Sequence, residues 1–442
     1  MAPPRPISEL ATIIERNARS LEDGLKGTAE ADFSVAFGAE LQAHMSPSLE
    51  AARSELLETV DELRVRVAGP LGYLIPTLLA APTLLGVFST LYMFDIASHV
   101  PLSEGGEISY RDLASRCGIP EDETRRLVQA AIAFHVFEEA KPNVSVKHNA
   151  LSSALAATQI KEIAGFLVEE QALSFGKLAE SMRRYPGSGE PGHAAAVLAA
   201  REQIAIKQTG VNEEDVPDPS KTYFEYMADD PERVARFRSI MGFTTKIAGF
   251  KATYFIDSVP WADKSQCPET IADVGGAGGE LCQQILRRFP NIKKATILDL
   301  PEVIADVKAP EDLEGRLGFL SYNFFAQKVT HQADAYIFRH IFHDWSDKYC
   351  AKILRNLVPA LKKGTRIWIS DTNVPDLSEG SHMKDQFTRS MDMFMMSGFN
   401  AKERNREGWE GMLAGADERF SIVSIVSPKG GQDSVIEVVF DA

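Results

Sequence analysis

The residues best suited to chemistry begin in a glycine-rich turn, Asp-Val-Gly-Gly-Ala-Gly-Gly, at residues 273–279. An apolar segment that predicts a strand leads into the turn, and a helical run from Leu281 to Arg288 follows it. Glycines at such a turn let the backbone lie against a ligand where a Cβ would clash. Asp299 ends the next predicted strand, where a carboxylate can bind ribose hydroxyls. The pattern predicts a nucleoside-bearing cofactor, and a tight turn without a ligand is the alternative.

Three cofactor classes compete for this turn. A phosphate-binding loop needs Gly-Lys followed by Ser or Thr, and Gly279-Glu280-Leu281 stands there instead. A dinucleotide site needs a third small residue three places after Gly278, where Leu281 is too bulky for close helix packing. S-adenosylmethionine carries no phosphate and needs only close backbone approach and an acid for its ribose. We therefore expect S-adenosylmethionine.

A histidine follows the fourth predicted strand, in Arg339-His-Ile-Phe-His343. Doubly wound proteins hold their sites at the carboxyl ends of parallel strands. A neutral imidazole accepts a proton from a hydroxyl near pH 7, which prepares the oxygen for methyl transfer without a metal ion. His343 is thus the candidate base, and the alternative is that it caps a helix starting near Ser346. We interpret His340 as a structural residue that faces elsewhere.

Two acids are candidates to orient the second nitrogen of this imidazole. Asp371 ends the next predicted strand, and Glu403 lies in Asn400-Ala-Lys-Glu-Arg404, where we expect a later helix to begin. A methionine-rich run and nearby apolar residues could shape an adaptable pocket for an aromatic ring, with ordinary helix core as the alternative. These are residues 391–396, Phe237, Met241 and Phe243.

The elements that must position these residues alternate between strand and helix from about residue 268 onward. Such alternation predicts a parallel sheet with helices on both faces. The last two strands are separated by a short turn containing Gly430-Gly431, so we expect them to form an antiparallel hairpin. The predicted strands are 270–274, 295–299, 317–322, 333–338, 366–371, 420–426 and 434–440.

The first half of the chain has a different sequence pattern. Apolar residues recur at helical spacing from about residue 7 to 66 and again to residue 97, which predicts either a subunit interface or a core helix bundle. The apolar stretch 69–96 is interrupted by Pro70, Pro76 and Pro82 and is interpreted as buried helices, not a membrane span. Residues 107–153 predict two helices and a β-hairpin, a winged-helix pattern.

The composition of the chain disfavours some classes of binding partner. The chain has 442 residues and a formal net charge of −15, so we expect neither nucleic acid nor an anionic membrane as a partner. The winged-helix segment is itself as acidic as it is basic, which argues against DNA binding. Four scattered cysteines and an N-terminus without a signal-peptide core predict a cytoplasmic protein without a structural zinc site.

Several segments together resemble one family. They are Asp273-Val-Gly-Gly-Ala-Gly278, Asp299-Leu-Pro-Glu-Val-Ile304, His343-Asp-Trp-Ser-Asp347, Lys402-Glu-Arg404 and the stretch 223–231. In this ordered set the chain resembles the plant- and fungal-type small-molecule O-methyltransferases, which include caffeic acid and flavonoid O-methyltransferases. The resemblance covers nearly the whole chain.

The resemblance implies an α/β fold of the class I methyltransferase kind. This is a Rossmann-like, mostly parallel seven-stranded sheet with a C-terminal antiparallel hairpin. It further implies an N-terminal α-helical, winged-helix-like dimerisation domain over residues 1–182, a linker over 183–222 and an S-adenosylmethionine-binding catalytic domain over 223–442. The chain would act as a homodimer whose N-terminal helices help to close the partner's pocket.

The resemblance also implies roles for individual residues and no metal. His343 would be the general base, flanked by Glu403 and Asp371. The cofactor would contact Asp273, Gly275, Gly276, Gly278, Asp299, Leu300, Asn323, Phe324 and Arg339, with Asp299 on the ribose and Asn323 on the adenine. The acceptor would lie near Phe237, Met241, Met393, Met396 and Asn400. Family members often carry Glu, Asp and Lys where this chain has Asp371, Asn323 and Arg339.

The expected activity is methyl transfer to a hydroxyl of an aromatic or polyketide-like secondary metabolite. The main alternative is a pericyclase or dehydratase that binds S-adenosylmethionine on the same fold without transferring its methyl group. Such relatives often lack the catalytic histidine, so the presence of His343 and Glu403 favours methylation. A regulatory winged-helix protein with a degenerate cofactor domain is disfavoured by the intact glycines and the acidic charge.

Overall fold

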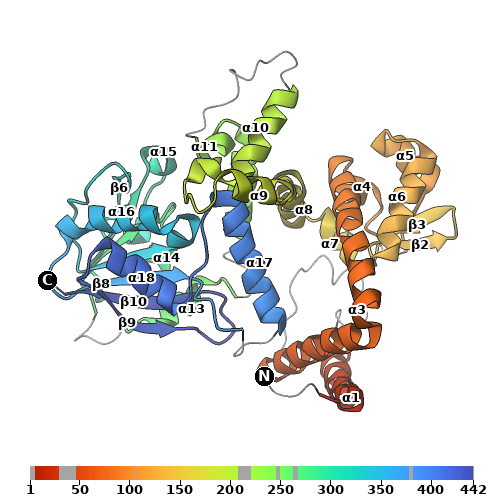
Figure 1. Ribbon diagram of the computed structural model, residues 1–442, viewed down its shortest axis with the longest axis horizontal. Coiled ribbons are helices and arrows are strands. Elements are labelled where there is room, and N and C mark those ends of the chain that lie inside the picture. The colour runs from red at the N-terminus through yellow and green to blue at the C-terminus, as the bar shows by residue number, and fades with distance from the viewer. Residues whose placement is uncertain are drawn as a thin grey trace. The chain divides into compact units, whose positions relative to one another are not determined.

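A computed structural model describes residues 5–28, 46–103, 105–207, 221–244, 249–261, 267–377 and 382–441 (Figure 1). Contacts divide the chain into two compact units. The N-terminal unit comprises Met1–Leu173, Ala235–Ile240 and Ser381–Lys384, and the sheet unit comprises the rest. Residues 174–234 thus group with the sheet, while the predicted boundaries at 182 and 222 stay predictions. Part of the predicted linker, residues 208–220, lies outside the described residues.

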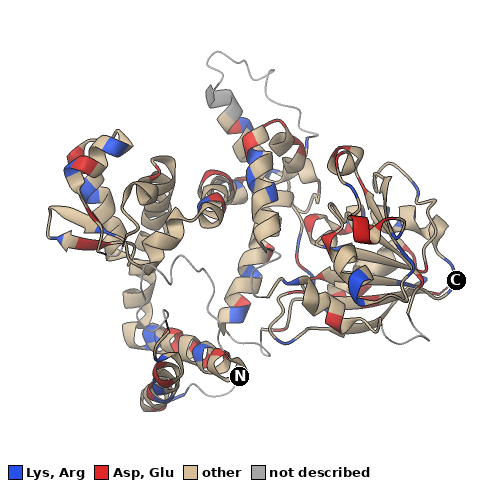
Figure 2. Ribbon diagram, turned by 180° about the vertical axis from the view of Figure 1, so that it is seen from behind, with Lys and Arg blue, Asp and Glu red and all other residues tan. Residues whose placement is uncertain are grey.

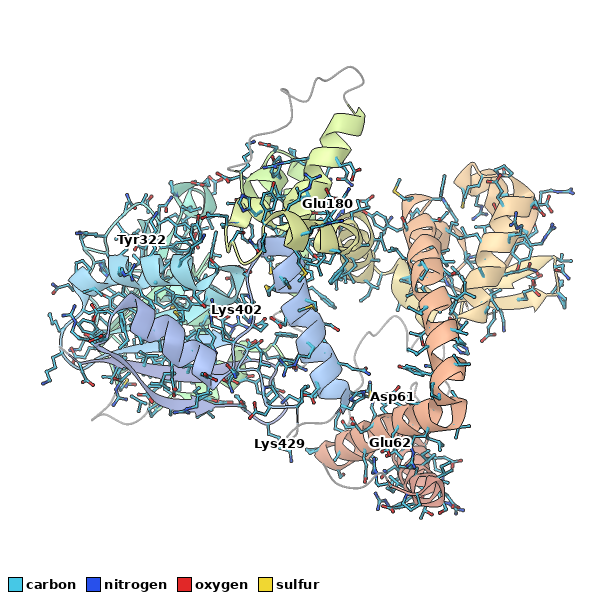
Figure 3. The ribbon with its side chains drawn as sticks, in the orientation of Figure 1. Asp61, Glu62, Glu180, Tyr322, Lys402 and Lys429 are labelled. Atoms are coloured by element: carbon cyan, nitrogen blue, oxygen red, sulfur yellow. The ribbon has the colours of Figure 1, made fainter. Side chains whose placement is uncertain are left out.

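Two long helices open the N-terminal unit. Helix α1 (Ile7–Leu25) packs against α3 (Pro47–Met93), and Asn17 and Arg16 both bond to Glu55. Helix α3 changes direction at Gly69, whose φ of 67° suits a residue without a Cβ. The charged side chains of α3, such as Asp61 and Glu62, lie before this kink (Figure 3), and residues 70–93 carry no charge (Figure 2).

The second half of α3 corrects an expectation, because the apolar stretch is not buried. Five of its apolar side chains are between 52% and 72% exposed: Leu71, Leu74, Ile75, Leu78 and Leu79. We call these five residues the apolar face of α3. Only the last turns, at Val87 and Leu91, enter the core of the unit. By length and composition alone this helix also qualifies as a membrane span.

The rest of the N-terminal unit packs around those last turns. A three-stranded sheet has the order β1-β3-β2, with both pairings antiparallel. The hydrophobic core of the unit packs this sheet against helices α5 and α6, as in the predicted segment of two helices and a hairpin. The elements are α4 (Ile96–His99), β1 (Glu107–Ser109), α5 (Tyr110–Cys117), α6 (Glu121–Ala133), β2 (Glu138–Lys141), β3 (Ser145–Lys147), α7 (Ala150–Ala156), α8 (Thr158–Phe166) and a π-helical turn, Leu167–Gln171.

A group of helices precedes the main sheet. Tyr223, Tyr226, Met395 and Phe399 form a small core among them, which anchors the methionine-rich helix α17 (His382–Phe399). Within the segment interpreted as a linker, residues 195–207 form a helix, α10. The other elements are α9 (Ala172–Arg184), a 3-10 turn (Pro191–His193), α10 (Ala195–Lys207), α11 (Tyr223–Ala228), α12 (Pro231–Thr244) and α13 (Ala252–Ser258).

The main sheet has seven strands in the order β6-β5-β4-β7-β8-β10-β9. The first five are mutually parallel and β10 is antiparallel to both neighbours, so the predicted parallel sheet with a terminal hairpin is confirmed. The strands are β4 (Thr270–Val274), β5 (Lys294–Asp299), β6 (Leu317–Ser321), β7 (Ala335–Arg339), β8 (Thr365–Asp371), β9 (Phe420–Val426) and β10 (Ser434–Phe440).

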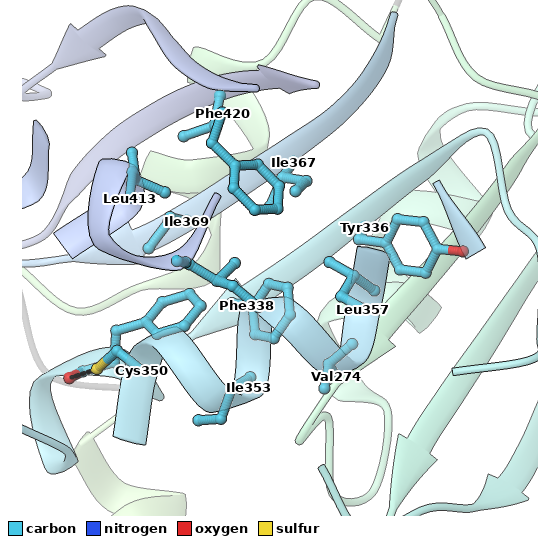
Figure 4. Packing of buried hydrophobic residues seen from close by; sticks show 14 of the residues in the cluster. Val274, Tyr336, Phe338, Cys350, Ile353, Leu357, Ile367, Ile369, Leu413 and Phe420 are labelled. Atoms are coloured by element: carbon cyan, nitrogen blue, oxygen red, sulfur yellow. Dashed lines mark hydrogen bonds between the residues drawn. The ribbon is translucent and has the colours of Figure 1, made fainter. Parts of the chain in front are cut away.

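Alternating side chains of these strands build a core on each face of the sheet. On one face Val274, Phe338 and Ile369 pack with α16 (Asp347–Leu357) and α18 (Arg406–Ala416), as Figure 4 shows in part. On the other face Ile337 and Trp368 pack with α13 and α14 (Glu280–Arg288). Two buried faces hold the sheet rigid, so the loops at the carboxyl ends of its strands have fixed starting points.

Candidate active site

The glycine-rich turn joins β4 to α14 and leaves its backbone uncovered. The Gly275 amide donates to the Leu298 carbonyl at 2.8 Å, which ties the turn to β5. Gly275 and Gly279 have φ of 77° and 75°, and a Cβ on Gly276 would lie 2.7 Å from the Asp273 carboxyl carbon. Burial raises the pKa of Asp273 to about 7. The turn therefore admits no side chain at Gly276, and its backbone forms a cradle that fits a nucleoside cofactor.

The predicted ribose acid lies beside this turn. Asp299 accepts hydrogen bonds from the backbone amides of Ala277 (2.9 Å) and Leu300 (2.7 Å). Burial raises the pKa of Asp299 despite these bonds. Because a carboxylate has about four acceptor positions, two remain for hydroxyl donors. The two amides fix the carboxylate at the edge of the cradle, where the prediction places the ribose.

The remaining predicted cofactor residues have structural partners of their own. The Asn323 side-chain oxygen accepts from the Phe325 amide at 2.9 Å and so caps a turn. Phe324 packs edge-on against Phe325, with ring centroids 4.6 Å apart. The Arg339 guanidinium donates to the Phe250 carbonyl at 2.7 Å, while its buried Nε has no hydrogen-bond partner among the described residues.

His343 lies on a 3-10 turn, Phe342–Asp344, just past β7, with its side chain 15% exposed. Its Nδ1 is 3.1 Å from Glu403 Oε1 and 3.9 Å from Asp371 Oδ1. The second oxygen of Asp371 accepts from the Phe342 amide at 3.1 Å. The structure thus brings the three predicted catalytic residues together, and Glu403 makes the hydrogen bond to the imidazole.

The placement of Glu403 differs from the expectation that it begins a helix. It lies in an extended segment, because α18 starts three residues later with Asn405 as its side-chain cap. Buried Arg404 holds this segment against the histidine turn by donating to the carbonyls of Phe342 (2.8 Å) and Trp345 (2.7 Å). Arg404 is a positioning residue that the sequence analysis did not assign, although it belongs to the Lys402-Glu-Arg404 motif.

Negative charge surrounds the imidazole. Burial alone would lower the pKa of His343, but Asp371, Asp344 and Glu403 raise it well above its usual value. Burial raises the pKa of Asp371 to about 8 and that of Asp344 to about 6. Asp371 Oδ1 and Glu403 Oε2 are buried without a hydrogen-bond partner in the described part of the chain. The cluster therefore retains a proton near neutral pH and releases it as the pH rises.

The interpretation of His340 as facing elsewhere is wrong. Its ring stacks on His343, with centroids 5.6 Å apart and an interplanar angle of 25°. Its Nε2 is 2.6 Å from Asp433 Oδ2, a carboxylate that the sequence analysis did not consider. A left-handed backbone at His340, with φ of 54°, turns the chain so that both rings lie on one side.

The residues predicted to contact the acceptor are more widely separated than the predicted catalytic residues. Met393 and Met396 lie three residues apart on α17, with Met393 39% exposed, and Met241 is 43% exposed at the end of α12. Phe237 belongs to the N-terminal unit and packs on Phe166. Asn400 uses its amide to hold a loop, donating to Ser188 Oγ and to the Glu190 carbonyl.

The loop that Asn400 holds was not recognised from the sequence. It covers residues 188–190, which we call the clamped loop. Ser346 Oγ donates to the Gly189 carbonyl at 2.7 Å, and Tyr349 OH donates to Glu190 Oε2 at 2.7 Å. Lys348 donates to the Ser188 carbonyl at 2.6 Å. The clamped loop therefore packs on the segment that directly follows His343.

Comparison with known proteins identifies relatives of this chain. An O-methyltransferase domain model matches residues 194–418. The grayanic acid biosynthesis cluster O-methyltransferase of Cladonia grayi is 31% identical over 439 residues, covering 98% of this chain and 88% of the relative. OxaC in complex with sinefungin and meleagrin superposes with a TM-score of 0.72 at 18% identity, covering 97% and 99% of the two chains. A pericyclic reaction enzyme gives 0.67 at 18%, covering 92% and 97%.

The sheet order and the glycine cradle after its first strand define a class I methyltransferase fold. Within that class, the family model and the relatives show that the chain belongs to the O-methyltransferase domain family. It is an S-adenosylmethionine-dependent O-methyltransferase. The two structural likenesses show the fold alone, so the pericyclic enzyme does not favour the alternative activity.

Proposed function

We propose that this enzyme methylates a hydroxyl group of an aromatic or polyketide-like secondary metabolite, with His343 as the general base. The observation that supports the base most directly is the 3.1 Å contact between His343 Nδ1 and Glu403 Oε1. It fixes the ring and assigns the proton to Nδ1, which leaves the lone pair on Nε2 for the acceptor hydroxyl. The relatives' names support the substrate class, since one belongs to a grayanic acid biosynthesis cluster.

In this proposal the glycine cradle and Asp299 hold the nucleoside of S-adenosylmethionine, with Asn323, Phe324 and Arg339 near its base and edge. The bound cofactor supplies an electrophilic methyl group. Asp273 is a buried acid next to the cradle, and Leu300 donates its amide to Asp299. A side chain at Gly276 would collide with Asp273, so glycine at this position lets the buried acid pack against the turn.

The chain's own part in the reaction is to move one proton. The acceptor hydroxyl donates its hydrogen to His343 Nε2, and the oxygen keeps the electron pair of the broken O–H bond and becomes the nucleophile. The resulting imidazolium is stabilised by Glu403 through Nδ1, with Asp371 3.9 Å away. Met241, Met393 and Met396 are the proposed contacts for the flat acceptor.

We also propose that the enzyme is a homodimer through the apolar face of α3. An uncharged helical surface of this extent is rare on a monomer and marks an interaction site. A second copy presents the same surface, so the contact is self-complementary around a two-fold axis. This assignment leaves the charged first half of α3, with Asp61 and Glu62, in water.

The proposed base is tested with methyl-labelled S-adenosylmethionine and a panel of phenolic polyketides. His343→Gln should lower kcat for label transfer by about 100- to 10,000-fold, the usual contribution of a general base. Its affinity for S-adenosylmethionine, measured by calorimetry, should stay within about twofold of the native enzyme. The control is His331→Gln, which alters a histidine before the opposite end of β7. Full activity of the His343 variant, or an unlabelled rearranged product, would contradict the proposal.

A further inference from the structure

A second imidazole–carboxylate pair lies directly beside the proposed base. His340 Nε2 and Asp433 Oδ2 are 2.6 Å apart, and the Asp433 side chain is only 11% exposed. His340 stacks on His343 on one side and meets the edge of Phe250 on another, with ring centroids 6.3 Å apart. The proposed mechanism uses neither member of this pair, although His340 lies against the group that accepts the proton.

The pairing of β8 with β10 brings the carboxylate to this place. In the antiparallel register Ser434 lies opposite Asp371, so Asp433 comes to the carboxyl end of β8. His340 directly follows β7, the parallel neighbour of β8, and its amide donates to the Ser370 carbonyl at 3.0 Å. Two segments almost a hundred residues apart in sequence are thus held together by the backbone of three adjacent strands.

The charged groups around the two rings are mostly negative. His343 faces Asp344, Asp371 and Glu403, and the backbone of Glu403 is in turn bonded to Asp392. His340 faces Asp433, which also interacts with Arg339. Burial alone would raise the pKa of Asp433, but His340 and then Arg339 lower it overall. Asp433 is therefore ionised, and His340 is its hydrogen-bond partner at 2.6 Å.

We propose that His340 is a positioning residue, whose hydrogen bond to Asp433 offsets the charge of that carboxylate and so opposes protonation of the stacked His343. Three carboxylates already favour a proton on His343, and a protonated base cannot accept one from the acceptor. An unbalanced Asp433 would be a fourth negative charge. The hydrogen bond from His340 to Asp433 acts in the opposite sense, and the stacked ring also fixes the plane of His343. This inference rests on the proposed function of His343 as the base.

The test compares a single variant with a double variant. His340→Gln leaves the Asp433 carboxylate unbalanced, so the acidic limb of the pH profile of kcat/KM should move to higher pH by about one unit. His340→Gln combined with Asp433→Asn also removes the carboxylate charge, so the limb should return most of the way to its native position. A role in packing alone would give lower activity without this shift and reversal. His331→Gln is the matched control and should leave the profile unchanged.

A second readout does not depend on turnover. In protein labelled with ¹³C at histidine Cε1, the His343 resonance is assigned by its loss in His343→Gln and titrated in each variant. The same shift and its reversal should appear there. His340→Phe keeps an aromatic ring on His343 without the hydrogen bond to Asp433, and it replaces the glutamine variant if that variant does not fold.

The two readouts separate the inference from the proposed function. Methyl transfer that survives His343→Gln would contradict the role of His343 as the base. In protein that retains His343, the resonance of this histidine would still report its coupling to His340. An unshifted His343 titration in His340→Gln, or a shift that Asp433→Asn fails to reverse, would overturn the inference.

Discussion

At the scale of single residues, the site depends on how two carboxylates share one imidazole. Both acids were predicted from strand ends and motifs, but their ranking depends on distances of 3.1 Å for Glu403 and 3.9 Å for Asp371. Asp371 is fully buried and burial raises its pKa to about 8, so it shares the proton of the cluster with His343. Glu403 therefore orients His343 by a hydrogen bond, while Asp371 acts on the pKa of His343 through its charge.

This division of roles predicts the effect of Asp371→Asn. The amide keeps the oxygen that accepts from the Phe342 backbone but cannot become charged. Because Asp371 raises the pKa of His343, its loss should lower that pKa and move the acidic limb of kcat/KM to lower pH by about one unit. The shift is measured from pH profiles of the native and variant enzymes. A limb that moves to higher pH would contradict this assignment.

The sequence was sufficient to predict site residues that have a local sequence pattern. It was insufficient for site residues whose role depends on contacts between distant segments. The glycine cradle, Asp299 and His343 were found because each follows a strand in a recognisable pattern. His340 was misjudged and Asp433 was missed because their contact depends on β10 pairing with β8, a long-range choice that no local pattern specifies. Arg404 was named only within a motif, and its role follows from two backbone carbonyls distant in sequence.

At the scale of elements, every strand of the main sheet was predicted to within two residues. Continuous apolar runs bounded by turn residues are a strong signal when both faces are buried. Loops are harder, because polar loop contacts have no period. The clamped loop is the clearest case, since its partners Asn400, Ser346 and Tyr349 come from two distant segments.

The clamped loop predicts a difference between two similar substitutions. Gly189 and Gly187 have φ of 59° and 63°, so alanine costs about 1–2 kcal/mol at either position. A Cβ on Gly189 would also lie 3.0 Å from Ser346, whereas a Cβ on Gly187 meets nothing. Gly189→Ala should therefore lower the free energy of unfolding by about 1 kcal/mol more than Gly187→Ala. Denaturant titration measures both, and equal losses would show that the loop does not press on Ser346.

At the scale of the whole molecule, the apolar face of α3 was expected to be buried but is exposed. Hydrophobic sequence predicts removal from water, but it does not say whether the same chain or another copy supplies the covering surface. The prolines of this helix were interpreted as breaks, yet the helix continues through them after a kink at Gly69. The sequence analysis had left a subunit interface open, and the exposure favours it.

The proposed dimer predicts the effect of charges on this face. Leu74→Glu combined with Leu78→Glu should weaken self-association by more than about 100-fold, because burying two unpaired carboxylates is costly. Sedimentation velocity at micromolar concentration should show a native dimer and a variant monomer. Val423→Glu, an equally exposed apolar residue on β9, is the control and should remain dimeric. A native monomer, or native protein that pellets with lipid vesicles, would contradict the proposal.

The position of β10 has a consequence for how the enzyme is made. This strand is the last along the chain but lies inside the sheet, between β8 and β9, and Asp433 precedes it. While the ribosome still holds these residues in its exit tunnel, β8 has an open edge and His340 lacks its carboxylate. The nascent catalytic domain therefore carries an exposed strand edge until β10 leaves the tunnel and pairs with β8.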